Sequence, residues 1–189
     1  VDTLGSVQGV VMIPPNVDFS LVASVDTVIF DQVRLEKFNG KIGIKNGSLL
    51  MENTGFNLVG STFQMTGNYV PLNPFNATFD YHIRAKGFDI KRAYDEIPLF
   101  REMVSAAEYA QGIASLDYKL SGRLDANMDP VLPSIKGEGI FALDKVKLKG
   151  FKLMNSIAKD TENKELEDPE LAGVQIKSNI ANNLMTIER

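Results

Sequence analysis

The pair Asn46-Gly47 limits the possible folds of this chain strongly, because apolar and polar residues alternate on both sides of it. The alternation covers residues 40–45 before the pair and 48–51 after it. An Asn-Gly pair between two alternating segments is typical of a type I′ turn, in which both central residues take positive φ angles. We therefore predict a β-hairpin over residues 40–51.

The same alternation recurs along most of the chain. Successive side chains of a strand point to opposite faces, so this pattern predicts strands with one apolar and one polar face. We predict a mainly β fold with a few α-helices, in which a long, curved, largely antiparallel sheet has one apolar face. The residues expected on that face are Ile42, Ile44, Leu49, Met51, Phe63, Met65, Phe79, Tyr81, Ile83, Leu116, Tyr118, Leu120, Phe141, Leu143, Val146 and Leu148.

Two interruptions of the alternation predict helices, at 89–110 and at about 151–159. In the first, apolar residues recur at helical spacing, Asp89 is placed to cap the start, and Pro98 begins a second helix expected to end near Ala110. The chain is therefore expected to divide into strands over 7–85, a helical insert over 89–110, strands over 113–149, a helix and acidic loop over 151–170, and strands over 173–189.

Two further details are expected within these regions. The first strand should cover residues 7–13, with separate short strands following at 19–23 and 27–30. A second hairpin is expected over 137–150, and its likeness to the hairpin at 40–51 suggests an internal repeat.

Composition argues against several classes of function. The net charge is −4 and the basic residues are scattered, which argues against binding to nucleic acid. Cysteine is absent, which excludes disulfides, zinc sites built on cysteine and thiol catalysis. No apolar run approaches the roughly 20 residues that a membrane-spanning helix needs, and no signal peptide is visible. We expect the segment itself to be soluble.

The sequence contains no pattern that indicates catalysis. The single histidine, His82, alternates with Asp80 and Arg84 and is expected on the polar face of a strand. The carboxylates of residues 160–170 do not follow the spacing of a calcium-binding loop. Neighbouring Asp95-Glu96 diverge around a helix instead of converging on a substrate. We expect no enzymatic activity, no metal site and no cofactor.

The apolar face is therefore the feature most relevant to function, and it has two interpretations. One interpretation is an ordinary core, formed by two packed sheets or by a sheet covered with helices. The other is a groove whose apolar lining is filled by lipid tails. Both require the same side chains, so composition does not distinguish them.

The order of several segments resembles the C-terminal region of AsmA-like proteins. In the first part of the chain these segments begin with Ile13-Pro14-Pro15-Asn16 and continue through the predicted hairpin. The likeness covers roughly residues 10–160, and the segments that carry it are 13–19, 31–35, 38–49, 60–69, 79–81, 88–90, 137–143 and 150–153.

The resemblance implies a role in outer-membrane biogenesis. AsmA-like proteins are large envelope proteins of Gram-negative bacteria that extend into the periplasm as long, curled sheets, usually from an inner-membrane anchor. They resemble bridge-like lipid-transfer proteins and have no catalytic residues to carry over. We therefore expect residues 1–189 to be one segment of a larger periplasmic domain, whose membrane anchor and further strands lie outside it. The expected function is transfer of membrane phospholipid along the apolar groove.

Two related expectations follow from the same features. The alternative function is a periplasmic assembly factor or scaffold, in which an open sheet edge binds a strand of an outer-membrane protein or another envelope protein. For the groove itself, the helical insert at 89–110 is expected to cap the trough, and the alternative is that it packs on one end of the sheet.

Overall fold

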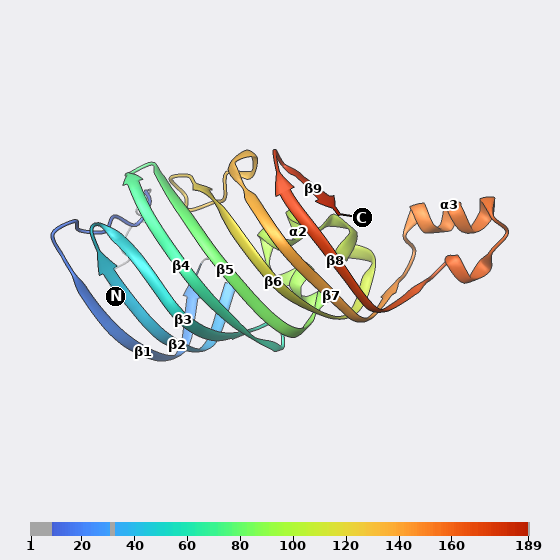
Figure 1. The fold of residues 1–189 in the computed structure, drawn as a ribbon, viewed down its shortest axis with the longest axis horizontal. Coiled ribbons are helices and arrows are strands. Elements are labelled where there is room, and N and C mark those ends of the chain that lie inside the picture. The colour runs from blue at the N-terminus through green and yellow to red at the C-terminus, as the bar shows by residue number, and fades with distance from the viewer. Residues whose placement is uncertain (1–8, 31–32, 189) are drawn as a thin grey trace, which may run out of the picture.

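The structure is a computed structural model that describes residues 9–30 and 33–188. Its main element is a single sheet of nine antiparallel strands in sequence order, which confirms the predicted mainly β fold (Figure 1). The strands are β1 Phe19–Phe30, β2 Val33–Lys45, β3 Ser48–Leu58, β4 Ser61–Asn73, β5 Asn76–Asp89, β6 Ala110–Leu124, β7 Lys136–Leu148, β8 Glu170–Ala181 and β9 Leu184–Ile187. The helices are α1 Ile90–Glu96, α2 Pro98–Met103 and α3 Lys152–Asp160, with 3-10 turns η1 Ser105–Tyr109, η2 Leu132–Ser134 and η3 Lys164–Leu166.

The predicted Asn-Gly hairpin joins β2 to β3. Asn46 and Gly47 have φ angles of 51° and 72°, as a type I′ turn requires, and Lys45 pairs directly with Ser48. The neighbouring pairs Ile44–Leu49 and Ile42–Met51 keep their apolar side chains on one face.

Irregular positions interrupt several of the ladders. The register shifts between Met51 and Thr54 in β3, and between Ala85 and Phe88 in β5. Another shift separates Ile113 from Ala114, where β6 meets β7. An extra residue of this kind bends a strand and increases its twist. The bulges thus account for the curvature of the sheet (Figure 1).

The helical insert between β5 and β6 begins as predicted. The Asp89 carboxylate accepts a hydrogen bond from the Arg92 backbone N–H at 2.8 Å, which caps α1. The second helix is shorter than predicted, because α2 ends at Met103 and Val104 leaves helical geometry with φ −126° and ψ 63°. The expected end near Ala110 is wrong, since β6 begins at that residue.

The predicted strand over residues 7–13 is wrong where the structure describes it. Residues 9–13 form an irregular segment that runs across the apolar face. The Val10 N–H donates to the Pro74 carbonyl at 2.9 Å, and the Val10 side chain is buried against Tyr69 and Ala77. Residues 7 and 8 lie outside the described residues. Burial of Val10 on the sheet therefore takes the place of strand pairing.

Two other predictions about the strands need correction. The strands expected at 19–23 and 27–30 are the single long strand β1, because β2 pairs along its whole length. The hairpin expected at 137–150 is also a single strand, β7, which pairs with β6 on one side and β8 on the other. Asp144 and Lys145 are both exposed there and form no turn, so the suggested repeat of the first hairpin does not exist.

The helix predicted near 151–159 is present as α3. It projects beyond β8 together with η3, away from the body of the sheet (Figure 1). The last two strands continue the sheet, since β8 pairs with β7 and the chain then turns back into β9, which pairs with β8. Among the described residues, no helix has the length and apolarity needed to cross a bilayer.

Candidate functional site

The candidate site is the apolar face of the sheet. Directly paired residues of antiparallel strands share a face, and the register places all the residues predicted for the apolar face together. Their exposure differs, however: Phe63, Phe79, Tyr118 and Val146 are buried, and the others are half-buried.

The helical insert covers one part of this face. Ile90, Ala93 and Ala107 of the insert are buried against Phe63 and Phe88 of the sheet. The same cluster extends to aromatic rings of β2 and β3, with Phe56 stacked on Phe63 at a centroid distance of 5.7 Å. This part of the apolar face is therefore a conventional core, in which the insert packs on the sheet.

Two irregular segments cover the opposite end of the strands. The first is the segment through Val10, where the Tyr69 hydroxyl donates to the Val11 carbonyl at 2.9 Å. The second is the loop after β6, which places Ile135 in full burial against Phe79. Neither cover was predicted. The segment through Val10 was expected to be a strand, and the sequence of the loop after β6 has no periodicity that shows where the loop folds.

A strip of the apolar face runs between these covers and partly beneath the insert, and we call it the central strip; most of its residues are half-buried. It follows the pairing register from strand to strand. Adjacent strands lie about 4.8 Å apart, so nine strands give the strip a length of about 38 Å. One row of directly paired residues runs along the strip through all nine strands and consists of Leu21, Ile42, Met51, Gly67, Tyr81, Leu120, Gly137, Ile180 and Met185.

The central strip is open at β1. Phe19, Leu21 and Val25 point to the apolar face and are 42 %, 41 % and 43 % exposed. The sequence prediction omitted these residues and also Ile180 of β8. Their alternating pattern was visible, but the tertiary pairing that assigns a face to each strand was not.

Aromatic rings lie over glycines in the middle of the central strip. A Cβ atom added to Gly67 would lie 2.6 Å from Tyr81 Cδ1, and one added to Gly139 would lie 2.6 Å from Tyr118 Cδ2. The glycines thus leave room for rings that lie close to the sheet. The Tyr118 hydroxyl lies 3.1 Å from Ser178 Oγ, so this buried pair satisfies its own hydrogen bonding.

Burial changes the acidity of the tyrosines in this region. Desolvation, followed by the neighbouring Tyr69, raises the pKa of Tyr81 from 10.0 to about 12. Desolvation also raises the pKa of Tyr118, although the hydrogen bond with Ser178 opposes the change. The direction of both pKa shifts follows from burial, which disfavours the charged tyrosinate.

We predict that Tyr81 loses its proton in the final step of the tyrosinate titration, at about pH 12, and that Tyr81→Phe removes this step. The folded protein holds the Tyr81 proton more tightly than the unfolded chain, in which the pKa is near 10. The contribution of this group to stability is thus complete below pH about 10 and is lost as the pH rises to about 12. Absorbance of tyrosinate and chemical unfolding at several pH values measure both effects. An unchanged final step in Tyr81→Phe would contradict the assignment.

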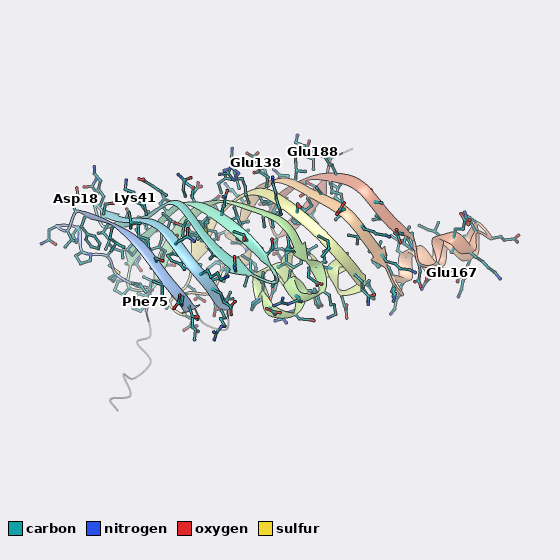
Figure 2. The ribbon with its side chains drawn as sticks, turned by 90° about the horizontal axis from the view of Figure 1, so that it is seen from below. Asp18, Lys41, Phe75, Glu138, Glu167 and Glu188 are labelled. Carbon is teal, nitrogen blue, oxygen red and sulfur yellow. The ribbon has the colours of Figure 1, made fainter. Side chains whose placement is uncertain are left out.

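The opposite face of the sheet is polar and carries ion pairs between neighbouring strands. Lys41 Nζ lies 2.8 Å from Glu52 Oε2, and Lys119 Nζ lies 3.5 Å from Glu138 Oε1. In Figure 2 the labelled Lys41 and Glu138 lie on the side of the sheet away from the helical insert. These exposed pairs contribute about 0–1 kcal/mol each, so their main effect is to keep this face hydrated.

The single histidine of the chain, His82, lies on the polar face. His82 Nε2 lies 2.5 Å from Asp117 Oδ1, and both side chains are solvent-accessible. Within residues 9–30 and 33–188, no three or more His, Asp or Glu side chains are placed to hold a metal ion. A surface hollow near α1 contains Arg34 and Arg92, but each guanidinium is paired with a glutamate of its own element.

Comparison of the chain with protein-family models, with curated proteins and with solved structures finds no match.

Proposed function

We propose that this segment binds lipid acyl chains along the central strip. The observation that supports this most directly is the continuity of the strip, which crosses all nine strands and is open at β1. Apolar side chains that remain exposed, as those of β1 do, cost free energy in water, and an acyl chain lying on them removes that cost.

The physical task of such a strip is to lower the barrier for moving a lipid through water. Each exposed CH₂ group costs about 0.8 kcal/mol, so two acyl chains cost tens of kcal/mol. A continuous apolar strip replaces much of that water contact. The polar opposite face, with its cross-strand ion pairs, stays in contact with solvent.

Within this proposal the chain is a non-enzymatic, AsmA-like segment of the periplasm. Its ligand is membrane phospholipid, and its role is phospholipid transfer that supports outer-membrane biogenesis in a Gram-negative cell. The order of sequence segments resembling that family supports this assignment, and so does the curved sheet with one apolar face.

The experiment compares two aspartate substitutions at equally exposed apolar residues on opposite faces. Leu21 is 41 % exposed on the apolar face, whereas Ile140 is 40 % exposed and pairs with Asp117 and Lys177 on the polar face. We expect Leu21→Asp to weaken binding of a phosphatidylcholine with a fluorescent acyl chain by about tenfold, since a charge placed on the strip must be desolvated. Ile140→Asp should bind like the unmodified chain.

Native mass spectrometry of protein purified without detergent gives an independent measurement. Phospholipid near stoichiometry, lost in Leu21→Asp but kept in Ile140→Asp, supports the proposal. A folded, lipid-free protein that also fails to take up the fluorescent lipid would reject it.

A second candidate function rests on the outer edge of β1, which pairs with no further strand among residues 9–30 and 33–188. This edge strand is 12 residues long, contains no proline and has Asp26 as its only charged residue. Val22 and Ile29 are also 84 % and 70 % exposed. Long apolar edges are normally protected by charge, proline or a covering element. The edge therefore fits an assembly factor that adds a strand of a nascent outer-membrane protein, and peptide binding that is lost with proline at Val22 would favour this function.

A further inference from the structure

We propose that an acyl chain binds at the position now filled by α2, and that the ligand displaces this helix from the central strip. This inference rests on the proposed lipid-binding function and assigns the ligand's place within it. It follows from how α2 is held and from what its side chains contact.

The segment α2 is the least secured part of the helical insert. Its neighbour α1 has a side-chain cap at Asp89 and buries Ile90 and Ala93, while η1 buries Ala107. By contrast, α2 has six residues, none of them buried, and its N-cap Ile97 makes no side-chain capping bond. A helix this short is not stable alone. The position of α2 therefore depends on its neighbours α1 and η1, which are held by their buried residues.

The side chains of α2 contact two neighbouring clusters of the apolar face, and the second of these includes residues of the strip. Phe100 meets Phe88 edge to face at a centroid distance of 6.1 Å, within the cluster beneath the helical insert. Met103 packs against the second cluster, which contains Phe79 and Tyr118. The helix therefore covers part of the strip through Met103, and its apolar side chains Phe100 and Met103 are only half-buried.

An acyl chain offers the sheet the same kind of surface as Phe100 and Met103. Exchange of one for the other keeps the underlying apolar residues covered, so the cost of moving α2 is limited to its own contacts. Binding then requires the open position, and the apparent affinity falls with the fraction of molecules that are open. Weakening the contacts of α2 should consequently tighten lipid binding.

The chain contains no cysteine, so one introduced thiol reports on α2 without interference. Met103→Cys places the thiol in the covering helix, and Ile140→Cys places a control thiol on the polar face. We expect maleimide labelling of Met103→Cys to accelerate severalfold when the protein is loaded with the fluorescent phosphatidylcholine. Labelling of Ile140→Cys should not change. Slower or unchanged labelling of Met103→Cys in lipid-loaded protein would overturn the displacement of α2.

A second measurement uses the affinity of the unlabelled protein. Phe100→Ala removes a contact of α2 with the sheet, and we expect it to tighten lipid binding by about tenfold. Arg101→Ala, at an exposed position of the same helix, is the matched control and should leave the affinity unchanged. Weaker binding by folded Phe100→Ala would mean that Phe100 is part of a fixed lining and would overturn the inference.

These results separate the inference from the function beneath it. If no variant binds the fluorescent lipid, the proposed function fails. If the lipid binds, Leu21→Asp weakens it, and both measurements on α2 are negative, the function stands and the displacement of α2 is wrong. Glycerophosphocholine, which has the headgroup without acyl chains, should neither bind nor accelerate labelling.

Discussion

Phe88→Ala is expected to lower the free energy of unfolding by about 3–5 kcal/mol, as truncation of a fully buried phenylalanine generally does. Phe88 is 1 % exposed and contacts Phe63 and Phe100 at centroid distances of 6.0 and 6.1 Å. Its removal leaves a cavity between the sheet and the helical insert. Because β4, β5 and α2 all contribute to this contact, they cannot close the cavity together without disturbing strand pairing.

The control for this prediction is Phe75→Ala. Phe75 has the same side chain, but it is 67 % exposed at the turn between β4 and β5. Its truncation should change the free energy of unfolding by no more than about 0.5 kcal/mol. Urea unfolding of both variants measures the difference. Equal, small losses in the two variants would show that the insert does not form a core with the sheet.

Gly67→Ala is expected to destabilise the protein by at least about 3 kcal/mol, since it combines backbone strain with a steric clash. Gly67 has a φ angle of 155°, and an added Cβ would lie 2.0 Å from the Asp80 carbonyl oxygen and 2.8 Å from Tyr81 Cα. These are backbone atoms of the paired strand β5, so relief requires β4 and β5 to separate. The same movement would displace Tyr81 from the central strip.

Gly43→Ala provides the matched control within the same sheet. A Cβ at Gly43 meets its nearest atoms at 3.6 and 3.8 Å, which is ordinary van der Waals contact. Alanine there should be neutral or stabilise the strand by up to about 1 kcal/mol, because glycine loses more conformational entropy on folding. Thermal unfolding compares the two variants. A loss at Gly67 no larger than the change at Gly43 would contradict the close approach of β4 and β5.

Phe88 and Gly67 lie in two different parts of the apolar face, one closed and one only partly covered. At Phe88 the helical insert converts the face into a closed core. At Gly67 and Tyr81 the sheet instead carries a ring that lies close to the backbone, without full burial. The proposed ligand site lies at the border of the two arrangements, where Phe100 of α2 packs on Phe88 and Met103 packs in the cluster that contains Tyr81.

The local rules of sequence correctly predict the elements that depend on near neighbours. The turn at Asn46-Gly47 follows from the need for positive φ angles, and the start of α1 follows from the capping carboxylate of Asp89. The alternation of Phe79, Tyr81 and their neighbours also assigns the correct face, because a strand has a period of two.

Other features depend on contacts between residues distant in the sequence, and the pattern alone does not contain them. The segment through Val10 alternates like a strand, yet it lies across the sheet because Tyr69 and Ala77 provide an apolar surface there. The pair Asp144-Lys145 resembles a turn, yet β6 and β8 supply hydrogen-bonding partners on both sides and keep β7 extended. Alternation therefore predicted an apolar face, whereas the packing of the covers defined which part of it stays accessible. The physical reason is that burial depends on the sum of long-range contacts, while turns, caps and strand periodicity depend on local backbone geometry.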